Sequence, residues 1–114
     1  MTTLADIDFE RHGGTVVARL GGEIDMTNAA HVREALLEAV PNDALGLVVD
    51  LGGCSYLDSA AIEVVFDLAR RLQRRRQALM LVVPDSSPLV RVLMLTDVGS
   101  VAPIHSTLAS ALAQ

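Results

Sequence analysis

Lysine and tryptophan are absent from this 114-residue chain, and cysteine occurs once, at Cys54. The lack of lysine excludes both a P-loop lysine and a Schiff-base lysine. One cysteine cannot form an internal disulfide, which is typical of proteins of the reducing cytoplasm. Together with three scattered histidines (His12, His31 and His105) it matches no zinc-site spacing, so we expect neither a metal site nor a cofactor.

Long hydrophobic runs and an excess of positive charge are also missing. No apolar run approaches the roughly 18 residues that span a bilayer. The N-terminal residues MTTLADIDFERHGG carry acids where a signal peptide has a basic flank and an apolar stretch. The formal net charge is -5, which disfavours binding to a polyanion. We therefore expect a cytoplasmic protein with no membrane contact and no nucleic-acid partner.

The residues that are present predict one packed domain. Hydrophobic residues make up 51% of the chain and aromatic residues only 3%, so the core has to be built from Val, Leu, Ile and Ala. The chain contains no linker, repeat or low-complexity segment. Its length of 114 residues then fits a single domain spanning residues 1–114.

The order of apolar patterns predicts an α/β fold. Alternating or continuous apolar runs indicate strands, and apolar stripes at helical spacing indicate helices. We expect a mixed, mostly parallel sheet of four to five strands, with an antiparallel hairpin at the N-terminus and about four helices. The predicted strands cover residues 5–11, 15–24, 44–51, 78–84 and 100–105, and the helices run from about 28 to 40, 59 to 77, 89 to 95 and 107 to 113.

Polar residues at the start of each predicted helix are candidate N-caps. Each would accept a hydrogen bond from a backbone N–H group that the first helical turn leaves unpaired. The candidates are Thr27 or Asn28, Asp58 or Ser59, Ser86 or Ser87 before Pro88, and Ser106.

The strongest local signal is the segment YLDSAAIEVV, in which a strand ends and a helix begins at Asp58-Ser59. The first N–H groups of that helix and its positive dipole end would favour a phosphate on the Ser59 hydroxyl, whereas Asp58 would repel it. The same pattern also fits a purely structural role, in which Asp58 or Ser59 caps the helix. The two roles are compatible, and both remain open at this point.

A second strand-to-helix loop lies in the segment GGEIDMTNAA and contains Asp25. An Asp in this position commonly forms an Asx-type hydrogen bond that ends a strand. Because both acidic loops follow strands of a largely parallel sheet, they can lie side by side at one edge of it. The pair of loops is therefore a candidate binding surface.

The segment ARRLQRRRQ places five arginines at the end of the second predicted helix. It contains no aromatic residue, and cations are favoured at a helix C-terminus. Asp67 has the spacing to pair with Arg70 and Arg71. We interpret the run as a solvated helix end that can also contribute to a partner surface, rather than as a nucleic-acid patch: Arg70, Arg71, Arg74, Arg75 and Arg76.

No catalytic constellation is found. Ser59 lacks the G-x-S-x-G elbow of serine hydrolases, and nothing in the sequence brings His31 or His105 to it. The glycine pairs do not form G-x-G-x-x-G. A small serine hydrolase therefore has no support, and we expect no catalytic residues and no enzymatic activity.

The two acidic loops resemble the motifs of the STAS-domain family, of the bacterial anti-sigma factor antagonist type. The segment GGEID is similar to the family's G-E-[IL]-D motif. DLGGCSYLDSAA is similar to its D-[LV]-x-x-[VL]-x-[FY]-[LMI]-D-S-[ST]-G motif. The closing segment resembles the family's last helices, with Asp97 in place of the glycine of an L-x-L-T-G-L turn. The resemblance covers essentially the whole chain in the family's order.

The resemblance implies a partner-switching role in transcription regulation. Ser59 corresponds to the serine that a cognate anti-sigma factor, itself a serine kinase, phosphorylates; a PP2C-type phosphatase restores it. The unphosphorylated protein would bind the anti-sigma factor and so free a sigma factor. The resemblance also implies a partner-binding surface, formed by Asp25, Asp58, Ser59, Ala60 and Ala61.

The chain departs from the family pattern just after Ser59. Ala60 and Ala61 stand where the family has Ser or Thr and then Gly. A glycine would ease the close approach of a kinase, and a methyl group would obstruct it. The alternative function is therefore a STAS interaction module that is not phosphorylated and acts in a signalling or lipid-transport complex, with Ser59 serving only as a cap.

Overall fold

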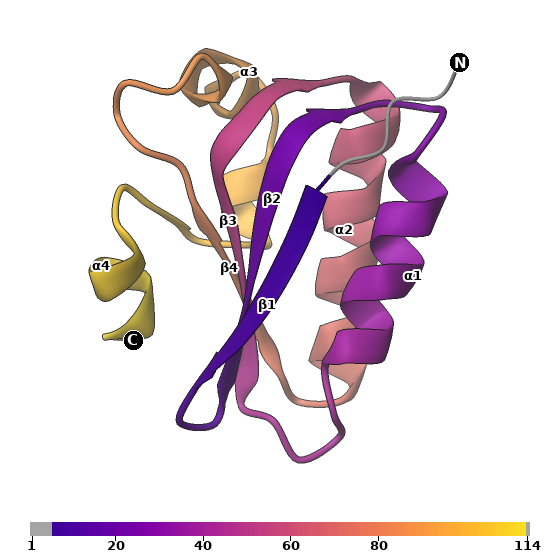
Figure 1. Ribbon diagram of the computed structural model, residues 1–114, viewed down its shortest axis with the longest axis vertical. Coiled ribbons are helices and arrows are strands. Elements are labelled where there is room, and N and C mark those ends of the chain that lie inside the picture. The colour runs from indigo at the N-terminus through magenta and orange to yellow at the C-terminus, as the bar shows by residue number, and fades with distance from the viewer. Residues whose placement is uncertain (1–5, 114) are drawn as a thin grey trace.

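A five-stranded sheet with strand order β1-β2-β3-β4-β5 forms the centre of the computed structural model, which describes residues 6–113 (Figure 1). β1 and β2 form the predicted antiparallel hairpin, and all the other neighbours are parallel. The predicted mixed, mostly parallel sheet is confirmed. The strands are β1 (Asp6–His12), β2 (Thr15–Ile24), β3 (Gly46–Leu57), β4 (Ala78–Val82) and β5 (Ile104–His105).

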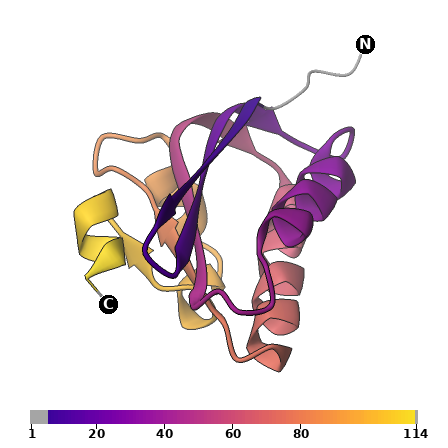
Figure 2. The same ribbon diagram turned by 60° about the horizontal axis from the view of Figure 1, so that its bottom comes forward.

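Four α-helices and one short 3-10 helix connect these strands. Each parallel strand lies next to its predecessor, and crossovers of the same hand place their helices on the same face of a sheet. α1 and α2 accordingly share one face, α3 packs against the same core at one end of the sheet, and α4 covers part of the other face (Figures 1 and 2). The helices are α1 (Ala29–Ala39), α2 (Ser59–Arg74), α3 (Leu89–Met94), η1 (Val98–Ser100) and α4 (Leu108–Leu112). No helix within residues 6–113 combines the length and the apolar character required to cross a membrane.

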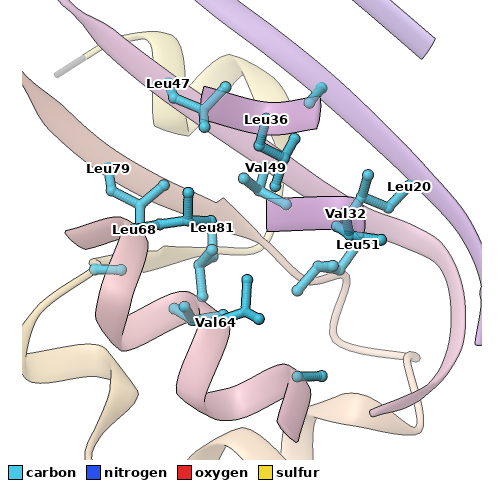
Figure 3. Packing of buried hydrophobic residues seen from close by; sticks show 14 of the residues in the cluster. Leu20, Val32, Leu36, Leu47, Val49, Leu51, Val64, Leu68, Leu79 and Leu81 are labelled. Carbon is cyan, nitrogen blue, oxygen red and sulfur yellow. The ribbon is translucent and has the colours of Figure 1, made fainter. Parts of the chain in front are cut away.

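The core is aliphatic, as the shortage of aromatic residues predicts. On the face of α1 and α2, side chains from the strands interlock with one apolar stripe from each helix (Figure 3). Leu36 of α1, Leu68 of α2 and Leu47 of β3 are each at most 1% exposed. Burying a leucine contributes roughly 1.5–3 kcal/mol. This layer therefore fixes the positions of α1 and α2 on the sheet.

The prediction of a strand over residues 100–105 is wrong for most of its length. Residues Val98–Ser100 form η1, and only Ile104–His105 pair with β4. Proline has no N–H group to donate to a strand, so Pro103 only accepts, from the N–H of Leu81. The N–H of Ala102 donates to Val98 O instead, which closes a turn before the strand begins.

The helix boundaries also differ in detail from the predictions. Thr107 rather than Ser106 caps α4, by accepting from the N–H of Ser110. Ser87, one of the two candidates, accepts from the N–H of Leu89 at the start of α3. Asn28 occupies the N-cap position of α1, but its side chain makes no cap hydrogen bond to that helix. Ala5, the first residue of the first predicted strand, lies outside the described residues.

α2 ends at Arg74, three residues before the predicted end at Gln77, because Arg76 takes a left-handed conformation with φ of 58°. The N–H of Gln77 donates to Leu72 O and the N–H of Arg76 donates to Gln73 O. This pair of hydrogen bonds is the Schellman motif, which normally has glycine at the left-handed position. An arginine there adopts a conformation that costs L-residues roughly 1–2 kcal/mol.

We therefore expect Arg76→Gly to stabilise the protein by about 0.5–1 kcal/mol, because glycine adopts this φ without steric cost. The measurement is the free energy of unfolding from urea denaturation. Arg74→Gly is the matched control. Residue 74 is the last residue of α2, and a glycine there should destabilise the protein by up to about 1 kcal/mol. Equal effects of the two substitutions would contradict this explanation of the helix end.

Candidate functional site

The site is formed where β2 and β3 end at the same level of the sheet. Parallel pairing continues to the pair Ile24 and Leu57, after two irregularities in register near Gly21 and Gly22. The N–H of Asp58 then donates to Ile24 O at 3.2 Å. The two acidic loops therefore lie side by side, as the sequence predicts.

Asp58 joins the two loops through its side chain. Its Oδ1 accepts from the N–H of Ala61 at 3.1 Å, which makes Asp58 the N-cap of α2. Its Oδ2 accepts from the N–H of Met26 in the neighbouring loop at 2.9 Å. Of the two cap candidates, the structure thus selects Asp58, and the same carboxylate holds the start of α1 next to the start of α2.

The side chain of Ser59 does not take part in the cap of α2. It is the first residue of the 16-residue helix α2 and is exposed. Among the described residues, its hydroxyl has no hydrogen-bond partner. A phosphate on this oxygen would lie at the positive end of the helix dipole and close to unpaired N–H groups. The geometry is compatible with chemical modification of Ser59 and requires none.

Asp25 forms the Asx-type turn that the sequence allows. Its Oδ1 accepts from both the backbone N–H and the hydroxyl of Thr27, at 2.9 and 2.5 Å. The two hydrogen bonds from Thr27 hold the pKa of the Asp25 carboxyl below its usual value. Asn28 braces the same loop, since its side chain accepts from the N–H of Asp25 and donates to Glu23 O. Asp25 is therefore a negative charge near neutral pH, half-buried beside the start of α2.

The two alanines after Ser59 have different environments. Ala60 is half-buried at the surface, whereas Ala61 is 3% exposed and belongs to the core. The methyl group of Ala61 packs in the core, so Ala60 is the only one of the two alanines whose side chain reaches the surface. Only the backbone N–H of Ala61 serves the site, through the cap to Asp58.

A groove of about 660 Å³ extends from the two loops along the seam between α1 and α2. No pattern named above predicts this groove, although the small residues at the starts of both helices are a signal that side chains leave space there. Met26, which is 78% exposed, lines the groove at the end near the two loops. The other lining residues are Ala29, Ala30, Arg33, Ala60, Glu63, Val64, Phe66, Asp67, Arg70 and Arg71.

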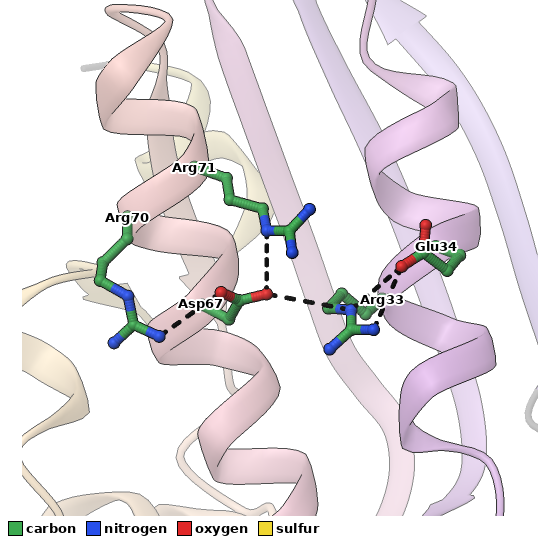
Figure 4. Close-up of polar contacts among 5 residues, drawn as sticks. All are labelled: Arg33, Glu34, Asp67, Arg70 and Arg71. Atoms are coloured by element: carbon green, nitrogen blue, oxygen red, sulfur yellow. Dashed lines mark hydrogen bonds and ion pairs between the residues drawn. The ribbon is translucent and has the colours of Figure 1, made fainter.

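An ion-pair cluster forms the far end of the groove (Figure 4). Asp67 pairs with Arg70 at 3.4 Å and with Arg71 at 3.1 Å, which confirms the predicted pairings. Arg33 reaches across from α1 to Asp67 at 3.8 Å and also pairs with Glu34 at 3.2 Å. The cluster therefore links α1 to α2. Within residues 6–113, no group of three His, Cys, Asp or Glu side chains is placed to hold a metal ion.

Because Asp58 holds both loops, we expect Asp58→Ala to lower the free energy of unfolding by about 1–2 kcal/mol. Hydrogen exchange should accelerate at the amides of Ala61 and Met26, which lose their acceptor. Asp97→Ala is the matched control, since Asp97 precedes η1 without a side-chain cap hydrogen bond. Faster exchange at Ala61 alone would show that the link to the neighbouring loop contributes nothing.

Comparison with known proteins agrees with this arrangement. The anti-sigma-F factor antagonist RsfA of Mycobacterium tuberculosis is 29% identical over 106 residues, covering 91% of this chain and 82% of RsfA. RsfB, an anti-sigma-F factor antagonist of the same organism, is 37% identical over 54 residues, which cover 47% of this chain and less than half of RsfB, 44%.

A solved structure and a family model extend the match to the whole fold. The crystal structure of an anti-sigma factor antagonist from Mycobacterium paratuberculosis is 26% identical with a TM-score of 0.83, covering 96% of this chain and 92% of that one. The STAS domain family model matches residues 6–111. Since that match includes both loops and every strand and helix around them, the chain belongs to the STAS domain family.

Proposed function

We propose that the protein is an anti-sigma factor antagonist, which binds a cognate anti-sigma factor and thereby frees a sigma factor in the cytoplasm. The observation that carries the proposal is the exposed Ser59, held beside the Asp25 loop by a neighbouring carboxylate that already caps the helix. The relatives named above are antagonists of this kind. The binding surface consists of Asp25, Asp58, Ser59 and Ala60, with Met26 added.

Phosphorylation of Ser59 is the proposed switch. The anti-sigma factor, acting as a serine kinase, transfers the γ-phosphoryl group of ATP to Ser59 Oγ, and a PP2C-type phosphatase hydrolyses the ester. The phosphate adds a charge of about -1.5 to -2. The fold tolerates it because the start of α2 favours an anion and because Ser59 makes no hydrogen bond that the ester would break.

The phosphate weakens binding of the anti-sigma factor. A partner shaped for a neutral hydroxyl would have to desolvate a dianion next to the carboxylates of Asp58 and Asp25. That penalty amounts to several kcal/mol, which is enough to disrupt a micromolar complex without a conformational change. A charge placed at one hydroxyl is therefore sufficient to release the anti-sigma factor.

We expect Ser59→Asp to stay folded and to lose the anti-sigma factor, and Ser59→Ala to bind it and to accept no phosphate. The reagent is the histidine-kinase-like ATPase that the wild-type chain captures from its own cytoplasm. Affinity is measured by calorimetry and phosphate incorporation with labelled ATP. Charge reversal by Asp25→Arg should weaken binding by about 1–3 kcal/mol.

The matched control is Ser86→Asp, which makes the same charge change at an exposed serine before α3. It should bind like the wild type. If Ser59→Asp also binds like the wild type and no kinase labels Ser59, then Ser59 is no switch. The protein would in that case act as an unphosphorylated STAS interaction module in a signalling or lipid-transport complex.

A further inference from the structure

The groove between α1 and α2 is lined in part by small side chains and has two ends of different charge. Ala30 of α1 and Ala60 and Val64 of α2 are among its lining residues. From residue 60 to residue 71, α2 extends about 16 Å at 1.5 Å per residue. That length and that lining match a short peptide segment laid along two helices, which is a common mode of peptide recognition.

The end of the groove near Ser59 is acidic, because Glu63 lines it and Asp58 lies just beyond it at the start of α2. The far end is basic, because Arg33, Arg70 and Arg71 surround one carboxylate, that of Asp67. Each guanidinium has five N–H donors in a fixed fork.

Asp67 and Glu34 occupy only part of the donors of these three arginines. The side chains of Arg70 and Arg71 are 62% and 46% exposed, so their remaining donors face the groove and solvent. The far end is therefore able to bind a further carboxylate.

We propose that the groove binds an acidic segment of the anti-sigma factor. Apolar side chains of that segment lie on Ala30, Ala60 and Val64, and a Glu or Asp side chain binds Arg71 and Arg33 beside Asp67. The proposal rests on the proposed function for the identity of the partner. It adds a second recognition element, about two to three helical turns from Ser59, that selects the partner by charge.

A nucleic acid does not fit this groove, even though arginines line its far end. A polyanion lying along it would meet Glu63 at the other end and Asp58 just beyond it, and these like charges would repel its phosphates. An acidic segment of limited length places its carboxylate only at the basic end. The distribution of charge therefore favours a peptide with local negative charge.

The first test compares two opposite substitutions in the cluster, with the captured kinase as the probe. Arg71→Gln should weaken binding about tenfold and reduce its salt dependence, because a charge-assisted hydrogen bond is lost. Asp67→Asn should strengthen binding several-fold and make it more salt-dependent, because the carboxylate that competes for the arginines is neutralised. A merely structural Asp67 would produce unchanged or weaker binding.

Arg91→Gln on α3 is the matched control, since Arg91 is an exposed arginine that does not line the groove. It should bind like the wild type. If Ser59→Asp abolishes binding while Arg71→Gln and Asp67→Asn leave it unchanged, the groove proposal is overturned and the proposed function stands. If the wild type binds no anti-sigma kinase, both proposals fail.

A crosslink identifies the occupant directly. Ala30→Cys places a thiol at an exposed position that lines the groove, where a benzophenone can be attached. Cys54 is 3% exposed and burial raises the pKa of its thiol, so it stays unmodified. Mass spectrometry of the crosslinked complex should find a kinase peptide that contains Asp or Glu. A peptide without acidic residues, or no crosslink in a complex that forms, would overturn the proposal.

Discussion

The carboxylate of Asp58 accepts hydrogen bonds from two N–H groups that lie 32 residues and three residues away along the chain. Its place is set by the parallel pairing of β2 with β3, which continues to the last residue of each strand. With Asp58 acting as both cap and link, Ser59 needs no structural role and keeps its hydroxyl exposed. Of these two adjacent residues, Asp58 therefore stabilises the loop pair, and Ser59 presents its hydroxyl to solvent.

The sequential strand order of the sheet determines where the helices lie. Because β2, β3, β4 and β5 follow one another across the sheet, their crossover helices gather on one face, and α1 and α2 become neighbours. Small residues in the first turns of these helices line the groove, and Arg33 and Asp67 join the two helices further along. The groove is therefore a product of topology. It leads from the Ser59 loop to the arginine end in one continuous surface.

Most of the fold was predictable because its signals are local. β2 has the predicted bounds, Thr15–Ile24, since a turn and a second loop enclose a β-branched run. Features that depend on distant partners were not predictable. The side chain of Gln77 donates to the carbonyls of Pro41 and Ala44, and it is 5% exposed although the arginines that precede it predicted a solvated helix end. The pairing of the last strand was likewise decided by Pro103 and the edge of β4.

The sequence by itself determined which residues begin α2, that Asp25 ends a strand, and that the two loops share an edge of the sheet. These follow from periodicity, turn chemistry and the rule that parallel strands end together. Only the tertiary structure decided that Asp58 rather than Ser59 is the cap, that the methyl group of Ala61 is buried, and that Arg33 reaches α2. A hydrogen bond between loops and an ion pair between helices require a particular packing distance, and no local sequence pattern encodes that distance.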